Sequence, residues 1–405
     1  MQDAPDRPTR RLILKGGFAG LAALMLEPLT GCSSEDSAGG SGGGGGSGGG
    51  PPLGSNIAQI GPLGDPDALG LRLPAGFSAR VVAQSAEEPI SGSGYQWHSA
   101  PDGGATFAMP DGGWVYVSNS ELPFAGGVGA LRFDKNGKLV DAYAILKNTN
   151  VNCSGGKTPW GTWLSCEEVP KGRVFECDPT GKTEGKELPA LGVFKHEAAA
   201  YEPENHHIYL TEDEKDGCFY RFVPDKLVSG RADLSAGKLE VATVATDGGV
   251  TWSALPDPTY AGATPTRQQV AGATLFDGGE GIVHFEGVIY FSTKGDDRVW
   301  AYHVATAKLD VFYDAAKITD PILKGVDALT VTCCGDILVA EDGDDMQVVA
   351  ILPDGSTKPL VQVMGHDGSE VTGLAFDPSG KRLYFSSQRG PAGGVTYEVT
   401  GPFHV

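Results

Sequence analysis

The chain has 405 residues and carries 51 acidic against 31 basic side chains, for a formal net charge of −20. Because such a surface repels phosphate backbones, nucleic acid is excluded as a partner. The surplus carboxylates either solvate the surface or bind hard cations.

The first 31 residues have the pattern of an export signal. Thr9 to Lys15 reads TRRLILK, a twin-arginine motif, and the apolar run from Gly16 to Leu26 that follows is too short for a membrane-spanning helix. The next residues, LTGC, are similar to a lipobox and end at Cys32. We therefore expect cleavage before Cys32 and lipidation of its thiol; an ordinary signal peptide followed by a chance cysteine is the alternative.

Residues 32–68 are expected to form a tether, and residues 69–405 a single catalytic domain. Ser33 to Pro52 is almost entirely Gly and Ser, the composition of a flexible linker. These features predict a monomeric cell-envelope lipoprotein, exported by the twin-arginine route and attached to the membrane only by its lipid. A serine directly after the lipidated cysteine favours the outer membrane, facing the periplasm or the cell surface.

Six copies of one strand pattern follow, each an apolar strand with an aromatic or leucine anchor and then a polar cluster. The anchors are Tyr116, Trp163, Tyr209, Tyr290, Leu338 and Tyr384. They are 46 to 48 residues apart, except for one interval of 81. With 60 glycines and 27 prolines and little helical periodicity, this spacing predicts an all-β, six-bladed β-propeller. The long interval predicts an insertion between blades three and four, at about residues 225–275.

The two ends of the domain are expected to pair with each other. Phe77 to Ala83 is an apolar strand before the first anchor, and Val395 to Thr400 follows the last one. Because a closed ring leaves no exposed sheet edge, we predict that these two strands share a blade.

Polar side chains recur at two constant places in each repeat. The first strands open on His98, Cys153, Glu197, Glu280, Asp327 and Glu370. The second strands end on Glu121, Glu167 with Glu168, Glu212 with Asp213, Lys294 with Asp296, Glu341 with Asp342, and Gln388 with Arg389. In a propeller both places meet at one mouth of the central channel, where so many carboxylates would repel one another without a cation. Solvated charges at the blade edges are the alternative.

The donor types indicate which cations these groups would hold. Several carboxylates favour a hard ion such as calcium, and a thiolate beside them favours a borderline metal such as iron. Cys153 is the cysteine that opens a first strand in phase with the acids. For Cys166, Cys177 and Cys218 we expect a structural role, as disulfides or buried thiols.

Several longer stretches resemble the PhoX-type alkaline phosphatase family. They are residues 152–168, 194–203, 209–224, 276–281, 325–331 and 370–388. The resemblance implies a six-bladed propeller that hydrolyses phosphomonoesters, with ferric iron (Fe³⁺) and calcium (Ca²⁺) in its channel. Carried over by motif, the ligands would be Cys153, Glu168, Glu197, Glu280 and Asp327, with Glu167, Glu370 and Asn152 as weaker candidates.

One departure from the family pattern concerns the anion site. The arginine that the family places two residues before the glutamate of blade four is Gly278 here. Lys294 and Arg389 end second strands, so we predict that they face the same mouth and hold the phosphate instead. Two rival functions stay open: a calcium-dependent lactonase or esterase, and a non-catalytic propeller stapled by calcium.

Overall fold

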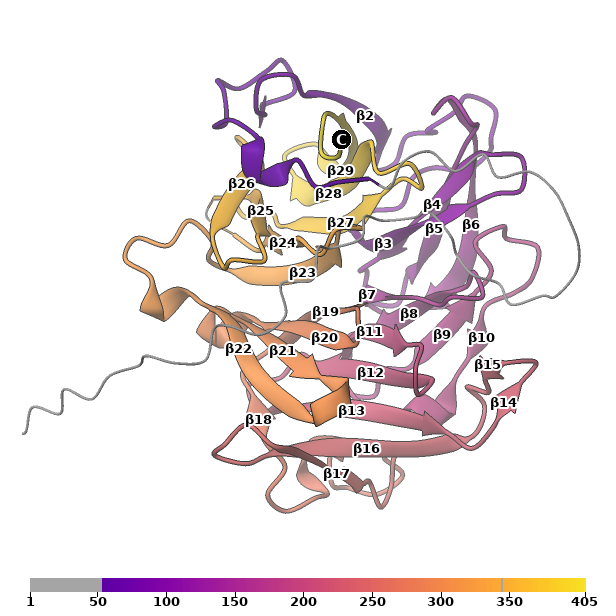
Figure 1. Cartoon of the computed structure of the whole chain (residues 1–405). Coiled ribbons are helices and arrows are strands. Elements are labelled where there is room, and N and C mark those ends of the chain that lie inside the picture. Colours follow the sequence, from indigo (N-terminus) through magenta and orange to yellow (C-terminus); the bar gives the residue numbers. More distant parts are fainter. Residues whose placement is uncertain (1–52, 344) are drawn as a thin grey trace, which may run out of the picture.

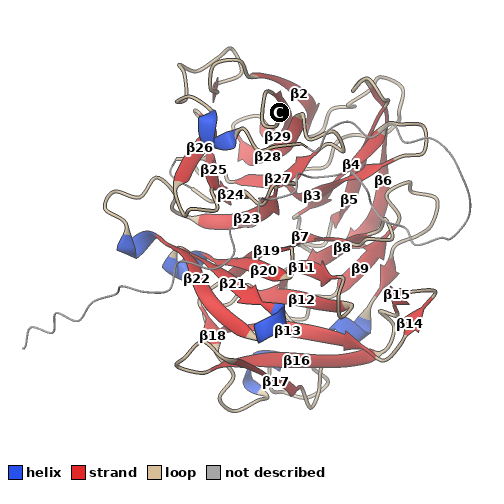
Figure 2. Ribbon diagram, in the orientation of Figure 1, coloured by secondary structure: helices blue, strands red, loops and turns tan. Residues whose placement is uncertain are grey.

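The computed structural model describes residues 53–343 and 345–405, which form six antiparallel sheets around a central axis (Figure 1). The predicted signal peptide, Cys32 and the Gly/Ser stretch 33–52 lie outside the described residues, whereas residues 53–68 of the predicted tether are described. Figure 2 shows that the described part is built of strands, with short 3-10 turns as its helices. No helix there is long and apolar enough to cross a membrane. The predicted six-bladed, all-β architecture is confirmed.

Each blade places its first strand at the axis and its last strand outside. Blade 1 holds β3 (Pro101–Ala108), β4 (Trp114–Ser120), β5 (Gly126–Phe133) and β6 (Leu139–Thr149). Blade 2 holds β7 (Asn152–Lys157), β8 (Trp163–Glu167), β9 (Val174–Cys177) and β10 (Lys186–Glu187). Blade 4 holds β19 (Gly279–Phe285), β20 (Val288–Thr293), β21 (Arg298–His303) and β22 (Lys308–Asp314). Blade 5 holds β23 (Val326–Val331), β24 (Ile337–Glu341), β25 (Gln347–Ile351) and β26 (Thr357–Val363), to which β1 (Leu71–Arg72) is added.

Blade 3 absorbs the long interval in the repeat. It contains β11 (His196–Glu202), β12 (His207–Glu212), β13 (Gly217–Pro224), β16 (Gly237–Val244) and β17 (Val250–Ala254). The short strand β18 (Leu275–Phe276) also pairs with β13, and β14 (Leu227–Val228) forms a separate hairpin with β15 (Arg231–Ala232). The structure therefore does not show an insertion between blades; most of that segment widens the third blade.

Blade 6 joins the two ends of the domain. It holds β27 (Val371–Phe376), β28 (Arg382–Gly390), β29 (Gly393–Thr400) and, as its outer strand, β2 (Ser78–Gln84). The ladder runs antiparallel from Ser78 opposite Thr400 to Gln84 opposite Val395. The predicted pairing of the two ends is thus confirmed, with one residue of difference at each end of the first strand.

The helical segments are all single 3-10 turns in loops or at strand ends. They are η1 (Ile57–Gln59), η2 (Pro189–Leu191), η3 (Thr266–Gln268), η4 (Lys294–Asp296), η5 (Val304–Thr306) and η6 (Ala315–Lys317). The core lies between the blades, where the second strands carry their anchors. Tyr116 and Tyr384, for example, are fully buried and stack with ring centroids 5.1 Å apart across blades 1 and 6. Of the six anchors only Tyr290 is half-buried; the others are buried.

Each first strand is interrupted by a shift in its register with the second strand. The shifts lie between Pro101 and Gly104, Asn152 and Gly155, His196 and Ala199, Gly279 and Ile282, Val326 and Leu329, and Thr372 and Ala375. Such a bulge leaves a residue outside the ladder and turns its side chain in a new direction. In five blades the first residue inside the shift is an acid or a cysteine, so the bulges aim these side chains at the axis.

Candidate metal centre

An inner ring of six side chains lies at one mouth of the channel, five from the first strands of blades 1 to 5 and one from the residue just before the first strand of blade 6. We call it the inner ring; its members are Asp102, Cys153, Glu197, Glu280, Asp327 and Glu370. Ligand atoms of Glu197, Glu280 and Asp327 all lie within 4.8 Å of one another. The Cys153 thiol donates to Glu197 Oε1 at 3.2 Å and to Asp102 Oδ2 at 3.6 Å. The structure thus brings together five carboxylates and one thiol from six different blades.

An outer ring comes from the ends of the second strands. Its members are Glu121, Glu168, Asp213, Lys294, Asp342 and Arg389. Lys294 Nζ lies 3.1 Å from Glu280, 3.2 Å from Asp327 and 3.1 Å from Asp342. Arg389 pairs with Glu370 at 2.8 Å and with Glu121. The prediction that both cations face the same mouth as the acids is therefore confirmed.

In blades 2 and 5 the acid just before the outer-ring acid has a different role. Glu167 Oε1 accepts the amide of Asn150 at 2.9 Å, and Glu341 accepts the amides of Lys324 and Gln347 at 3.1 and 3.0 Å. These carboxylates bridge backbone amides at the ends of their hairpins. Because side chains alternate along a strand, Glu167 faces away from the axis while Glu168 faces it.

Asn152 is the second predicted ligand that the structure does not bring to the rings. It stands opposite Glu167 in the β7–β8 ladder, one residue before the bulge that turns Cys153 inward. Its Nδ2 donates to Ser165 Oγ at 2.9 Å, and its Oδ1 accepts the Thr149 hydroxyl at 2.5 Å. Both ends of this fully buried amide are thus used by hydrogen bonds to blades 1 and 2.

Sequence reasoning chose the wrong residue in blade 1. His98 lies before β3, with its ring nitrogens 3.0 Å from Tyr95 Oη and 3.2 Å from Ser118 Oγ. Burial lowers the pKa of His98 to about 3, so it is a neutral core residue. Asp102 occupies the ring position instead. The signal that could have found it is the small residue that follows the ring residue in several blades, as in Asp102-Gly103 and Glu280-Gly281.

Sequence reasoning also missed a third cation near the rings. Lys195 Nζ lies 2.9 Å from Glu168 and 2.7 Å from Asp213, so it bridges the outer ring between blades 2 and 3. It stands just before β11, outside the two positions at which polar side chains recur in each repeat. The repeat pattern in the sequence therefore does not identify it.

The inner ring is strongly buried, and this changes the protonation of its acids. Burial raises the pKa of Glu370 to about 8 and that of Asp327 to about 6, and neighbouring carboxylates add to both shifts. Burial and then the charge of Glu280 raise the pKa of Glu197 well above its usual range. Burial likewise raises the pKa of the Cys153 thiol, followed by the charge of Asp102. The positive charges of Lys195, Lys294 and Arg389 therefore do not balance the acids of the two rings.

These features fit a multinuclear metal site. Glu197 Oε2 is buried and accepts no hydrogen bond from the described residues. One carboxylate oxygen of the inner ring therefore has no donor there. The carboxylate oxygens suit hard cations, and Cys153 with Glu168 and Glu197 forms a mixed sulfur–oxygen group whose ligand atoms lie within 4.8 Å. Bound cations would return the acids to their charged forms.

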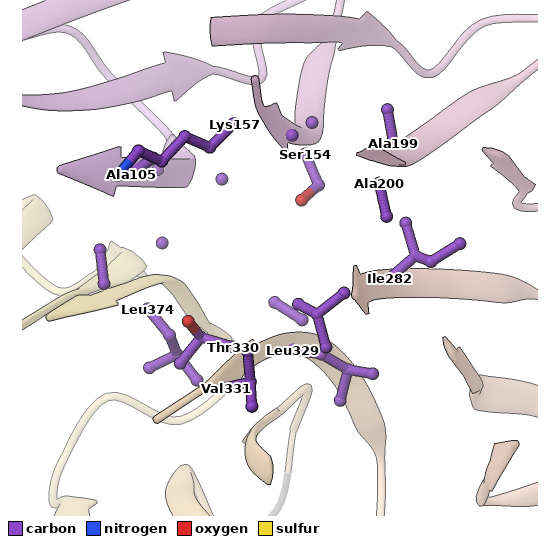
Figure 3. Close-up of a pocket in the computed structure, with 18 of the residues that line it drawn as sticks. Ala105, Ser154, Lys157, Ala199, Ala200, Ile282, Leu329, Thr330, Val331 and Leu374 are labelled. Atoms are coloured by element: carbon purple, nitrogen blue, oxygen red, sulfur yellow. The ribbon is translucent and has the colours of Figure 1, made fainter. Parts of the chain in front are cut away.

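Beyond the inner ring the channel continues as a cavity of about 360 Å³. It is lined by the residues that follow the ring in each first strand. Figure 3 shows Ser154, Ala199, Ala200, Ile282 and Leu329 around the open centre. The strands approach closely here: a Cβ on Gly281 would lie 2.4 Å from the backbone nitrogen of Leu329. Small side chains thus let the blades close tightly enough to bring six ligands together.

The other cysteines predicted to be structural are buried thiols. Cys166, Cys177 and Cys218 are at most 2% exposed, and none of the three forms a disulfide. Burial raises the pKa of Cys177 to about 12, so it stays protonated.

Comparison with solved structures supports the fold. A protein of unknown function from Bacteroides thetaiotaomicron has a TM-score of 0.52 at 9% identity, covering 80% of this chain and 76% of its own. A gluconolactonase from Xanthomonas campestris has a TM-score of 0.44 at 15% identity, and the match covers 85% of this chain and 98% of the gluconolactonase chain. At 9% identity the Bacteroides likeness bears on the fold alone, and no argument rests on the likeness to the gluconolactonase. A search of curated proteins found no match.

The comparison with family models is more specific. The model described as "Alkaline phosphatase PhoX" matches residues 124–173 and 170–390. The matched stretch includes all six blades in part and every inner-ring residue except Asp102. With its rings of carboxylates, a thiol and cations at one channel mouth, the chain belongs to the PhoX alkaline phosphatase family, a family of hydrolases.

Proposed function

We propose that this protein hydrolyses phosphomonoesters at an iron–calcium cluster held by the two rings. The observation that carries the proposal is the inner ring itself, where four buried carboxylates, one half-buried carboxylate and one thiol converge with too few cations to balance them. Family membership supports phosphatase chemistry, and the donor types support the choice of ions.

The residues divide by the ions they would hold. Cys153, Glu168 and Glu197 would hold iron, because a thiolate suits a borderline metal. Groups made only of carboxylates would hold calcium; they are Asp102 with Glu121 and Glu370, Glu197 with Glu280 and Asp327, and Asp327 with Asp342 and Glu370. When bound, the ions supply positive charge for the phosphoryl oxygens and lower the pKa of an attacking water.

Lys294 and Arg389 would bind the phosphoryl group. Arg389 is 49% exposed at the rim, with donors beyond those used by Glu121 and Glu370. Gly278 lies beside Lys294: a Cβ there would be 3.7 Å from Lys294 Cβ and 3.2 Å from Asp213 Oδ1. Lys294 thus lies next to the position where the family carries its arginine, and its ammonium group contacts Glu280 and Asp327. This placement supports a relocated anion site.

Metal analysis with kinetics tests the proposal. In natively exported protein we expect bound iron and calcium, and turnover of a phosphomonoester. Cys153→Ala should remove the iron, its visible absorption and turnover while the fold persists, and the buried control Cys166→Ala should keep the iron. Colourless, iron-free protein in which Cys153→Ala behaves as wild type would instead support a calcium-stapled propeller or a calcium-dependent lactonase or esterase.

Substrate binding is tested separately. Arg389→Ala should raise KM for a phosphomonoester by about tenfold or more with the metal content unchanged, because a charge-assisted contact is lost. Lys294→Met should act in the same direction. Arg173→Ala, which removes a surface ion pair with Glu187, is the matched control. Unchanged kinetics in both test variants would show that the phosphate is held by other groups.

The export route is a further proposal, supported by the twin-arginine motif and the lipobox-like sequence. Replacing both Arg10 and Arg11 by lysine should leave precursor in the cytoplasm. Cys32→Ala should release mature protein from membranes. Unchanged fractionation of both variants would contradict an outer-membrane lipoprotein.

A further inference from the structure

A second group of metal-ligating side chains lies far from the rings. The Cys333 and Cys334 sulfurs and a ring nitrogen of His404 lie within 4.8 Å of one another. The two cysteines stand in the turn between β23 and β24, whereas Asp327 stands at the opposite end of β23. At about 3.3 Å per residue, roughly 20 Å of chain separates them from the inner ring.

The turn that carries the cysteines is held by its own hydrogen bonds. Thr332 Oγ1 accepts the amides of Cys334 at 3.2 Å and Asp336 at 3.1 Å, and it donates to Asp336 Oδ2 at 3.0 Å. Thr332 and Asp336 are both buried. These contacts place Cys333 Sγ 3.5 Å from Cys334 Sγ. Two thiolates bound at about 2.3 Å to one tetrahedral ion lie roughly 3.8 Å apart, so this separation needs little adjustment.

His404 presents its second ring nitrogen as a lone pair. Its Nδ1 lies 2.8 Å from the carbonyl oxygen of Gly380, and because a carbonyl only accepts, Nδ1 must carry the hydrogen. Nε2 is then unprotonated in the neutral ring; it is buried and has no hydrogen-bond partner among the described residues. The ring also packs edge-on against Phe376, with centroids 5.4 Å apart. An imidazole whose other nitrogen donates to a carbonyl is typical of metal ligands.

We propose that Cys333, Cys334 and His404 bind one Zn²⁺ ion. Two sulfurs and an imidazole nitrogen suit zinc, and they differ from the oxygen donors that dominate the rings. On binding, each thiol releases one proton to solvent, and the two thiolates neutralise the charge of the ion. Cys333 is exposed, so water would be able to reach the ion as its fourth ligand.

The ion would clamp the place where both ends of the chain meet. His404 forms a β-bridge with Ser55, and the Gly54 and Val405 backbones exchange hydrogen bonds at 2.9 Å. Cys334 Sγ lies 3.4 Å from the carbonyl oxygen of Leu53, the first described residue after the linker. Zinc would thus join blade 5, the C-terminus and the start of the domain. The inference is independent of phosphatase activity.

Metal binding by the full-length protein tests this site. Chelator-treated wild type should take up one more Zn²⁺ per chain than the Cys333→Ser/Cys334→Ser double variant. With Co²⁺ as the probe, it should show a thiolate-to-metal absorption band that the double variant lacks. His404→Gln should weaken zinc binding at least tenfold, whereas His303→Gln, which alters a half-exposed histidine elsewhere, should not. Zinc should raise the melting temperature of wild type more than that of the double variant.

Cys153→Ala separates this site from the inner ring, because it removes the ring thiol and should leave the zinc-dependent differences intact. Phosphatase turnover should be equal in the wild type and the Cys333→Ser/Cys334→Ser variant. Equal zinc uptake and equal cobalt spectra in these two proteins would overturn the proposal. A disulfide between Cys333 and Cys334 in the isolated protein, seen by mass spectrometry, would also overturn it.

Discussion

At the scale of single residues, neighbours in the sequence have opposite roles at the channel mouth. Glu168 belongs to the mixed sulfur–oxygen group with Cys153, whereas Glu167 accepts a backbone amide at the hairpin end. Burial raises the pKa of Glu168 to about 7, and its side chain also pairs with Lys195. The structure therefore places only the second acid of the pair beside the other ring side chains.

This division predicts different effects of two matched substitutions. Glu168→Gln should lower bound iron and reduce phosphatase turnover by at least about 100-fold, because a charged ligand is lost. Glu167→Gln should leave both nearly unchanged, since an amide oxygen still accepts the Asn150 amide. Iron content and kinetics of the two purified variants check this. Equal losses in both would show that Glu167 also reaches the metal.

At the scale of elements, the bulges in the first strands of five blades turn an acid or a cysteine toward the axis. Glu280 and Gly281 lie inside the shift in β19, and Gly281 lets β23 pass closely. Bulges need space beside them because the strand bends there. The small residue after the ligand is therefore part of the site, although it offers no ligand atom.

Gly281→Ala should test this packing. The added methyl group would meet backbone atoms of Ala328 and Leu329, which cannot move without shifting blade 5. We expect a loss of about 1–3 kcal/mol in the free energy of unfolding, measured by denaturant titration, together with weaker metal binding. Gly61→Ala is the control, since nothing lies within 4 Å of its Cβ position. Equal stability of the two variants would mean that the backbone at Ala328 and Leu329 moves to make room for the methyl group.

The closure of the ring makes a second prediction at this scale. Val82 on β2 is 7% exposed, while its neighbour Val81 is 39% exposed. Val82→Asp would bury a carboxylate between blades and should cost about 3 kcal/mol or more. Val81→Asp should cost less than about 1 kcal/mol. If both variants melt at the wild-type temperature, β2 does not hold the propeller closed.

At the scale of the whole molecule, the rings link stability to pH and to cations. Burial raises the pKa of Asp327 to about 6, of Glu168 to about 7 and of Glu370 to about 8. Between the unfolded pKa, near 4, and these folded values, the folded protein binds more protons than the unfolded chain. Stability of the metal-free protein must therefore fall as pH rises through this window.

The prediction is that chelator-treated protein has a melting temperature that declines from pH 5 to pH 8. The loss should amount to a few kcal/mol, because one pKa unit corresponds to about 1.4 kcal/mol. Added Ca²⁺ should restore most of it, with the largest effect at pH 8, where more of the acids are charged than at pH 5. Thermal scans across pH, with and without Ca²⁺, measure this. A metal-free protein that is most stable at pH 8 would contradict the account of the rings.

The sequence alone determined the features that repeat locally. Anchor spacing predicted six blades, the flanking strands predicted closure, and the phase of the polar residues predicted a convergent mouth with Cys153, Glu197, Glu280, Asp327 and Glu370. These features follow from strand alternation and hairpin geometry, which depend on nearby residues.

Only the tertiary structure decided what depends on single-residue shifts or on distant contacts. The bulge in β3 turns Asp102 toward the axis, whereas His98 lies before that strand. Alternation along the chain places Glu168 rather than Glu167 at the mouth. Sheet pairing placed the long interval within blade 3. Closure of the propeller brought His404, next to the last residue of the chain, to Cys333 and Cys334. His404 also bridges Ser55, so this contact depends on residues far apart in the sequence.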